Sequence, residues 1–224
     1  MRLWLIPFIS MLLFSACMGP DDVEQYLAYQ ASVEGQEISS TGFPAGTIRF
    51  DSTLSYIGSD SFILYGIARC EVHLFAEIDN QNQVRRLYWT QYEGYLPSLL
   101  PRSYDYFDEP YRTEIAGKVF YDGDNYYNID DERPEWSPDS DIGRVFALLE
   151  REGYQFNGDT MRIRLVHLDE SHKNELMIIY MEPMAQNGLS IQSLGPGGKS
   201  SSTWVDAASA LRARALAGMT LTFE

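Results

Sequence analysis

Cysteine, histidine and basic side chains are scarce in this chain of 224 residues. Two cysteines allow at most one disulfide, and three histidines leave few ligands for a zinc site. Lysine and arginine number 17 against 32 aspartates and glutamates, so the formal net charge is −15. A surface of this charge repels phosphate groups, which excludes nucleic acid as a partner held by electrostatics. It also argues against binding anionic lipid head groups by charge.

The N-terminal apolar run is too short to cross a membrane. Leu3–Ala16 is apolar except for two serines, but it has 14 residues, and a spanning helix needs about 20. One basic residue, Arg2, precedes the run, as in a secretory signal. The sequence therefore predicts that residues 1–16 form a signal peptide that is removed.

The run ends in Phe14-Ser15-Ala16-Cys17. These four residues resemble the lipobox of bacterial lipoproteins, although that family prefers leucine at the position of Phe14. The resemblance implies cleavage before Cys17, acylation of Cys17 with chains such as palmitate, and a membrane anchor in the cell envelope. Because Met18 rather than aspartate follows, it implies the outer membrane, facing the periplasm, in a bacterium with two membranes. The alternative is an ordinary secretory signal, cut near Ala16, that releases a soluble protein.

A lipid on Cys17 leaves Cys70 without a partner, so an exported domain would be stabilised by its apolar core alone. Loss of Arg2 with the signal lowers the net charge from −15 to −16. The 15 tyrosines, 11 phenylalanines and 4 tryptophans exclude a disordered acidic tail. We expect the lipidated cysteine with a tether or short helix over residues 17–36, the helix itself over 22–33, and a single domain over 37–224.

The clearest element is Ser61–Asp79, in which small and apolar residues alternate with polar ones. A period of two over this length predicts one long strand, bent near Gly66. A turn and a returning strand over Val84–Glu93 complete the hairpin. The favoured register pairs opposite charges across the strands. It places Glu77 opposite Arg85, Arg69 opposite Glu93, and His73 opposite Trp89.

A second hairpin is predicted over Asp159–Glu182, with Arg162 opposite Glu182. Apolar spacing predicts helices from Pro138 or Asp139 to Gly153 and over Trp204–Ala217, the latter with Val205 in its apolar stripe. A short strand over Met219–Phe223 follows. Hairpins and separated helices, without alternating strand–helix units, predict an α+β fold. We expect an antiparallel sheet built from long hairpins, with the helices on one face.

Two segments fall outside this scheme. Gly94–Asp141 is rich in tyrosine, proline and acid, and its oxygen-bearing run at 122–131 is either a calcium loop or a solvated acidic loop. The second is favoured because Tyr127 stands where the calcium pattern needs glycine. Gly188–Ser202 is a flexible connector by composition. Its GPGGKS end looks like part of a phosphate-binding loop, but Ser193 replaces a required glycine.

Motifs for nucleophilic or metal-assisted catalysis are weak. Cys70 lies among apolar strand neighbours, where a thiol stays protonated and inert. Gly188–Gln192 lacks the last glycine of a nucleophile elbow. His73 with Glu71 and Glu77 offers too few ligands for zinc, and pairing across strands explains these residues equally well. We therefore expect no metal and no cofactor.

The best candidate site is the polar face of the first hairpin. Flat rings beside acids and amides suit sugars or cationic groups, and the tyrosine-rich segment after Gly94 would roof such a site. The alternative is that these rings only cover the second face of the sheet. The candidate ligand-binding residues are Glu71, His73, Trp89, Gln91 and Glu93.

These features favour a lipid-anchored envelope protein that acts as a non-catalytic binding or accessory module. Its partner would be a small ligand, a sugar or a cation, or another envelope protein. The second candidate is an envelope hydrolase with Glu71 or Glu93 as its acid or base. The third is a scaffold that holds a protein partner and takes no small ligand.

Overall fold

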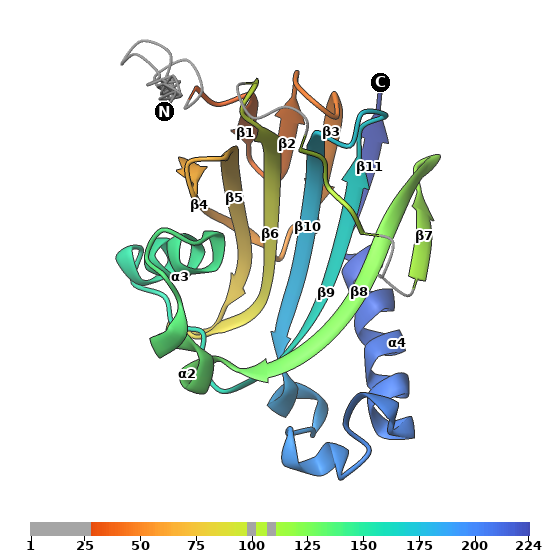
Figure 1. Ribbon diagram of the computed structural model, residues 1–224. Helices are drawn as coiled ribbons and strands as arrows, with labels where there is room; N and C mark the ends of the chain where they lie inside the picture. Colours follow the sequence, from red (N-terminus) through yellow and green to blue (C-terminus); the bar gives the residue numbers. More distant parts are fainter. Residues whose placement is uncertain (1–27, 98–101, 107–110) are drawn as a thin grey trace, which may run out of the picture.

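Two antiparallel β-sheets make up most of the fold (Figure 1). The computed structural model describes residues 28–97, 102–106 and 111–224. The large sheet has seven strands in the order β4-β5-β6-β10-β9-β8-β7, and the small sheet has four in the order β1-β2-β3-β11. With some helix beside this sheet, the fold is roughly of the expected α+β class.

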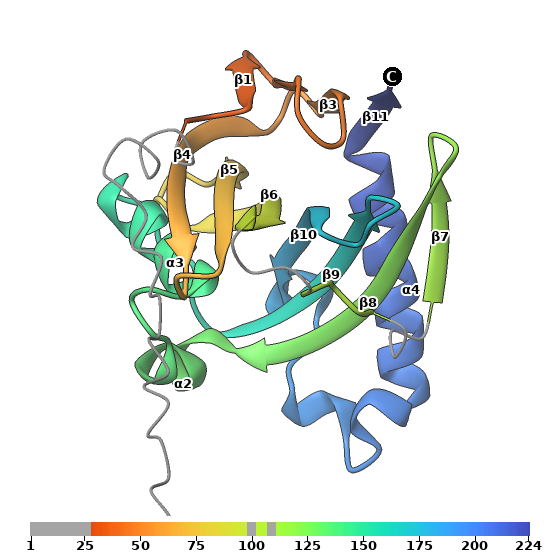
Figure 2. The same ribbon diagram turned by 45° about the horizontal axis from the view of Figure 1, so that its top comes forward.

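The large sheet is strongly curved (Figure 2), and each of its strands is antiparallel to its neighbours. Its strands are β4 (Ser55–Leu64), β5 (Ala68–Ile78), β6 (Val84–Tyr95), β7 (Tyr111–Ile115), β8 (Lys118–Asn128), β9 (Asp159–Leu168) and β10 (Asn174–Pro183).

The small sheet contains the first and the last strand of the described chain. Its strands are β1 (Ala31–Glu34), β2 (Glu37–Ser40), β3 (Gly46–Phe50) and β11 (Met219–Phe223). The predicted final strand is confirmed. The helix expected over residues 22–33 is wrong over its last residues, which belong to β1. Gly35, with a φ of +59°, forms the turn between β1 and β2 rather than ending a helix.

The single long strand expected over Ser61–Asp79 is wrong, because it is two strands joined by a tight turn. Tyr65 and Gly66 both adopt positive φ there, at 48° and 71°. From Gly58 to the turn, facing residues of β4 and β5 have the same parity, as in Leu64 opposite Ala68. The alternation of apolar and polar residues therefore continues unbroken through the turn, and the period of two does not reveal it.

The expected register between β5 and β6 is wrong by one residue. Glu93 faces Cys70 rather than Arg69. A one-residue change moves every side chain of one strand to the opposite face relative to its neighbour. Side chains of β5 and β6 that the expected register places on one face of the sheet therefore lie on opposite faces.

The cause is an irregularity beside the turn, where β6 carries an extra residue. Glu77 faces Arg86 instead of Arg85, and Arg86 Nε lies 2.6 Å from the Glu77 carboxylate. Arg85 instead contacts Asp79 at 3.2 Å. Opposite charges pair in this register as well, so charge pairing alone did not identify the correct one.

The second hairpin forms as expected, but its register is also shifted by one residue. Arg162 faces Met181 and Glu182 faces Met161, so the predicted Arg162–Glu182 pair is wrong. The arginine partner of Glu182 is Arg214, which comes from the C-terminal helix. Rules for pairing residues within a hairpin cannot predict a partner that comes from an element distant in the sequence.

The acidic run at 122–131 is neither a calcium loop nor a solvated loop. Most of it lies in β8, between β7 and β9. Asp122 has no exposed surface and accepts hydrogen bonds from Arg212 at 2.6 and 3.1 Å. Thr113 of β7 donates to the same carboxylate at 2.6 Å. The run resembles a loop in composition because the partners of its polar residues lie on other elements.

The helices are α2 (Ile129–Glu132), α3 (Asp141–Arg151) and α4 (Ser202–Ala217), with short 3₁₀ turns at η2 (Arg133–Glu135), η3 (Met184–Asn187), η4 (Gln192–Leu194) and η5 (Gly198–Ser200). Ser140 caps α3, and Ser201 caps α4. The stripe of α4 contains buried Trp204, whereas Val205 is 55% exposed, contrary to expectation. In the described ranges, no helix combines the length and the apolarity that a membrane span requires.

Two apolar cores lie on opposite faces of the large sheet, so the expectation of helices on one face is wrong. One core joins α4 and the small sheet to Ile178 and its alternate neighbours in β10. The other joins α3 to Ile179 and the intervening residues. The two helices accordingly stand beside different parts of the sheet in Figure 1.

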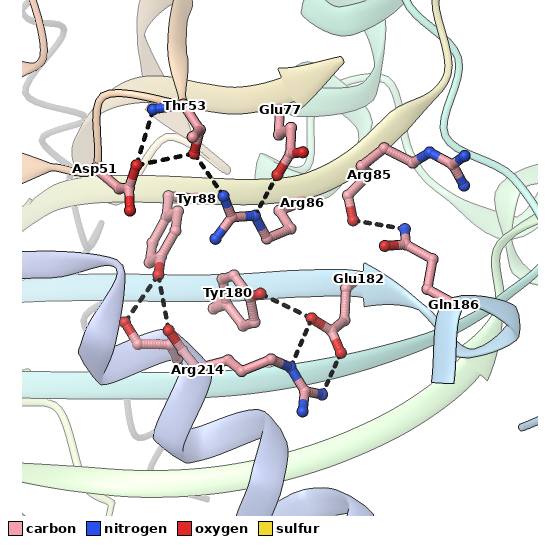
Figure 3. A network of polar contacts seen from close by, with 11 residues as sticks. Asp51, Thr53, Glu77, Arg85, Arg86, Tyr88, Tyr180, Glu182, Gln186 and Arg214 are labelled. Atoms are coloured by element: carbon pink, nitrogen blue, oxygen red, sulfur yellow. Dashed lines mark hydrogen bonds and ion pairs between the residues drawn. The ribbon is translucent and has the colours of Figure 1, made fainter. Parts of the chain in front are cut away.

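A polar network attaches the C-terminal part of α4 to the sheet (Figure 3). Glu182, only 3% exposed, accepts hydrogen bonds from Tyr180 at 2.7 Å and from both donating nitrogens of Arg214. Tyr88 donates to the carbonyl of Ala215 at 2.8 Å. The carbonyls at the end of α4 are among the groups that a helix leaves unpaired, so Tyr88 also caps this helix.

Candidate ligand-binding site

The shifted register places the predicted site residues on two faces of the large sheet. Trp89, Gln91 and Glu93 point to the face that α3 covers. Glu71 and His73 alternate with Cys70 and its neighbours on β5, so they point to the face that carries the small sheet. The structure therefore does not bring the five residues together.

Glu71 and His73 form a buried pair that fastens the start of the small sheet. Glu71 has no exposed surface, and its carboxylate accepts hydrogen bonds from the backbone N–H of Gln30 at 2.7 Å and of Ala31 at 3.0 Å. His73 Nε2 lies 2.8 Å from the same carboxylate. These contacts hold β1 against the large sheet, so the pair has a structural role.

The other three residues form a chain of hydrogen bonds along β6. Trp89 Nε1 donates to the side-chain oxygen Oε1 of Gln91 at 3.0 Å, and Gln91 Nε2 donates to the Glu93 carboxylate at 2.6 Å. Alternate residues of a strand share a face, which is why they reach one another. The two contacts fix the orientation of the Gln91 amide and point a donor at the Glu93 carboxylate.

Glu93 lies directly opposite a second buried carboxylate, Glu175 of β10. Glu93 is 8% exposed and Glu175 is 2% exposed. Tyr104 donates to Glu93 at 2.8 Å, and Tyr106 donates to Glu175 at 2.8 Å. Two tyrosines of the segment expected to roof the site thus contact one carboxylate each.

Burial raises the pKa of both carboxyl groups. For Glu175, burial and then the charge of Glu93 raise the pKa to about 8, although the Tyr106 hydroxyl and the charge of Arg164 act in the opposite direction. Burial also raises the pKa of Glu93, which three side-chain donors partly offset. Because burial and the facing Glu93 carboxylate disfavour the charged form, Glu175 retains a proton near neutral pH.

Cys70 is a buried neighbour of this pair. Its side chain has no exposed surface, and its Sγ lies 3.1 Å from a Glu93 oxygen. Burial, followed by the charge of Glu93, raises the pKa of the Cys70 thiol. The thiol therefore acts as a donor to Glu93 and not as a nucleophile.

A cavity of about 320 Å³ lies beside the carboxylate pair at the start of α3, and we call it the α3 cleft. Its apolar walls are Leu64, Trp89, Ile142, Met177 and Ile179, and its other lining residues are Glu93, Glu175, Asp141, Arg162, Arg164 and Tyr106. Apolar walls with a few charged groups are typical of small-molecule sites, whose volumes are roughly 300–1,000 Å³. We refer to Glu93 and Glu175 as the acidic end of the cleft.

The two arginines of β9 form a basic flank of the α3 cleft. Asp141, the first residue of α3, lines the same cavity as Arg162 and Arg164. Burial raises the pKa of Asp141, and the charges of the two arginines offset part of this rise. Arg164 Cζ lies 5.2 Å from the ring centre of Tyr106, the same tyrosine that donates to the acidic end. Acidic end and basic flank are therefore neighbours within one cavity.

Sequence reasoning missed four charged residues of the cleft. Arg162 and Arg164 occupy alternate positions of a strand that is otherwise largely apolar, and Glu175 precedes a run of buried residues. Charged residues on the strand face that packs against an apolar core therefore indicate a possible functional site in the sequence. Asp141 gave no such signal, because a carboxylate in the first turn of a helix is common for electrostatic reasons.

The predicted signal peptide at 1–16 and the predicted lipid attachment at Cys17 lie outside the described residues. Within the described ones, no group of three or more histidine, cysteine, aspartate or glutamate side chains is arranged to hold a metal ion. Comparisons with models of protein families, with curated proteins and with solved structures gave no match.

Proposed function

We propose that this chain is a binding module whose α3 cleft takes a small polar ligand. The observation that carries the proposal is the meeting of a buried acidic end, a basic flank and a tyrosine around one cavity. Burying charged groups costs free energy, and a fold of this size does not need them for stability. Carboxyl groups with perturbed pKa values in a cleft are candidates for a functional site.

A hydrolase that uses the acidic end is the second candidate. Glu175 retains a proton near neutral pH beside Glu93, which is the arrangement of a general acid with a charged partner. Binding is favoured because both Glu93 oxygens already accept hydrogen bonds, one from Tyr104 and the other from Gln91. Glu71, the other acid considered for catalysis, lies on the opposite face and is bonded to backbone N–H groups.

We further propose that Cys17 carries lipid and that the protein faces the periplasm from the cell envelope. The resemblance of Phe14-Ser15-Ala16-Cys17 to a lipobox supports this location. Two or more acyl chains hold a domain on a bilayer much more firmly than a single chain does.

A thermal-shift screen of the full chain tests the binding function. The panel contains glycans, peptidoglycan fragments, lipids, polyamines and divalent ions. A ligand at 100 times its dissociation constant stabilises by about 2.7 kcal/mol, which for this size raises the midpoint by roughly 5–10 °C. We expect one class to produce this shift.

Matched variants assign the shift to the cleft. Arg164→Gln should reduce it, whereas Arg151→Gln, at an exposed arginine of α3, should preserve it. A panel without any shift contradicts the binding function and favours the scaffold. Turnover of the shifting compound, lost in Glu175→Gln while the shift remains, favours the hydrolase.

A further inference from the structure

The α3 cleft adjoins a second cavity on the same face of the large sheet. This cavity has a volume of about 180 Å³, and we call it the α2 chamber because α2 and the turn that follows it supply part of its lining. Ile142 and Arg162 line both cavities, so the two meet at the start of α3. We call the two cavities together the extended groove. The α2 chamber is lined by Asn125, Tyr127, Glu132, Trp136, Ile142 and Arg162.

The extended groove crosses four neighbouring strands of the large sheet. Glu93 of β6 faces Glu175 of β10 at one end, and Arg162 of β9 faces Asn125 of β8 at the other. Three strand spacings separate β6 from β8, which is roughly 14 Å. Along β9, Arg162 lies six residues from Leu168, the residue that faces Glu175, so the ends also differ by roughly 20 Å along the strands. Such a span is longer than a single sugar ring.

An extended peptide is a poor occupant of this groove. The strands β6, β10, β9 and β8 are interior strands, each hydrogen-bonded to a neighbour on both sides. A peptide that adds to a sheet needs an open edge, where backbone N–H and C=O groups lack partners. The sheet face beneath the groove therefore offers side chains as binding partners.

The side chains of the groove suit sugars instead. Trp89 lines the α3 cleft and Trp136 lines the α2 chamber, so each cavity has a flat ring against which the C–H face of a sugar can pack. Asn125 supplies an amide, which both donates and accepts hydrogen bonds. Glu93 and Glu175 already accept hydrogen bonds from tyrosines, but a carboxyl group has further lone pairs for the hydroxyl groups of a ligand.

A buried hydroxyl group of the α2 chamber supports such a ligand. Tyr127 lines the chamber, and its hydroxyl oxygen is buried without a hydrogen-bond partner among the described residues. A buried polar group that lacks a partner costs free energy, and native structures contain few of them. A sugar hydroxyl in the chamber supplies a partner, because it can both donate and accept.

Resting on the proposed binding function, we infer that the extended groove takes an oligosaccharide of at least two sugar rings. One ring lies in the α3 cleft against Trp89, where its hydroxyl groups contact Glu93 and Glu175. The next ring lies in the α2 chamber against Trp136, where a hydroxyl group contacts Tyr127. A single sugar fills one cavity only and lacks the contacts of the other.

Isothermal titration calorimetry with saccharides of increasing length tests this inference on the full chain. One series is N-acetylglucosamine, chitobiose and chitotriose, and the other is glucose, maltose and maltotriose, which differs in its linkage. Trialanine serves as an extended peptide. We expect the trisaccharide of at least one series to bind roughly tenfold or more tightly than its monosaccharide, and trialanine not to bind.

Tyr127→Phe assigns the gain in affinity to the α2 chamber. The substitution removes a hydroxyl group that has no partner among the described residues, so the thermal midpoint should not fall. The affinity for the trisaccharide should fall roughly three- to tenfold, the loss expected for one neutral hydrogen bond.

Two further variants complete the test. Asn125→Ala, in the same chamber, should also weaken binding of the trisaccharide. Tyr126→Phe is the matched control, because Tyr126 packs against Trp204 on the α4 face of the sheet. Its affinity for every probe should equal that of the wild type.

The outcomes distinguish this inference from the binding function itself. Equal affinity for monosaccharides and trisaccharides, an unchanged affinity in Tyr127→Phe, or binding of trialanine without any saccharide overturns the oligosaccharide. If no saccharide of either series binds, the inference is overturned as well. In each case, a thermal shift with another class of compound that Arg164→Gln reduces retains the α3 cleft as a binding site. A thermal-shift panel without any response removes the binding function too.

Discussion

At the residue scale, Glu93 and Glu175 differ in the number of donors that reach them. Glu93 accepts from Tyr104 and Gln91 and contacts the Cys70 thiol, whereas among the described residues Glu175 accepts from Tyr106. Hydrogen bonds to a carboxylate favour its charged form. The charged form is therefore favoured more strongly at Glu93 than at Glu175.

The proton on Glu175 predicts a pH-dependent loss of stability. Its pKa rises from 4.5 to about 8 on folding, so between these values the folded state binds more protons than the unfolded state. The free energy of unfolding then falls as pH rises through this window. Glu175→Gln removes this loss. We expect the variant to be more stable than the wild type at pH 8, by on the order of 1–3 kcal/mol, and equally stable near pH 4.5.

Urea denaturation at several pH values measures this difference. Glu114→Gln, at an exposed glutamate of β7, is the control and should follow the wild type at every pH. If Glu175→Gln changed stability by the same amount at pH 4.5 and pH 8, Glu175 would not hold the proton.

At the element scale, local pattern predicted single elements well and their pairing poorly. The helix ending before Gly153 and the strand over Met219–Phe223 each depend on spacing within one segment, and both form. Registers depend on contacts that the segment does not contain. The extra residue at Arg85 moves β6 by one position, and Arg214 on α4 replaces the expected partner of Glu182.

For the same reason, only part of the candidate site could be predicted from the sequence. Trp89, Gln91 and Glu93 were identified because alternate residues of one strand must share a face. Glu71 was added through a register that the structure does not have. Glu175 was missed because its position opposite Glu93 follows only from the β6–β10 pairing, which joins residues about 80 positions apart.

The attachment of β1 to the large sheet depends on one carboxylate. Glu71→Gln would direct an amide N–H₂ at a backbone N–H of Gln30 or Ala31, and the lost bond would leave buried polar groups unpaired. We expect a loss of about 1–3 kcal/mol. Hydrogen exchange should accelerate in β1 and β2 while β9 and β10 remain protected. Glu77→Gln on the same strand is the control, and uniform acceleration throughout the chain would contradict a local attachment.

The end of α4 approaches the sheet closely enough to require glycine. A Cβ at Gly218 would lie 2.2 Å from the Tyr88 hydroxyl oxygen, which already donates to Ala215. The Tyr88 ring packs between Phe50 and Tyr180, so it cannot move aside without cost. Gly218→Ala should therefore cost about 1–3 kcal/mol.

A double-mutant cycle checks this cause. Tyr88→Phe removes the oxygen, so Gly218→Ala should cost less in that background than in the wild type. Equal costs in the two backgrounds, measured by urea denaturation, would show that the hydroxyl is not what Gly218 accommodates.

At the scale of the whole molecule, the large sheet separates the small sheet from the α3 cleft. The small sheet packs on the α4 face, and Glu71 fastens β1 to that face. The α3 cleft lies on the opposite face. β1, the first strand of the described chain, therefore lies on the side away from the cleft. We expect the proposed lipid on Cys17 and a ligand in the cleft to act independently.

Replacing the proposed lipid-bearing residue tests this independence. Cys17→Ser should abolish incorporation of labelled palmitate and move the protein from the membrane fraction to the soluble fraction of cells. The thermal midpoint of the purified chain and its shift with a cleft ligand should not change, because β1 and the cleft occupy opposite faces. Cys70→Ser, at the other cysteine, should retain both label and membrane association. A Cys17→Ser protein that still carries label would contradict the anchor, and a lost ligand shift would show that anchor and cleft are coupled.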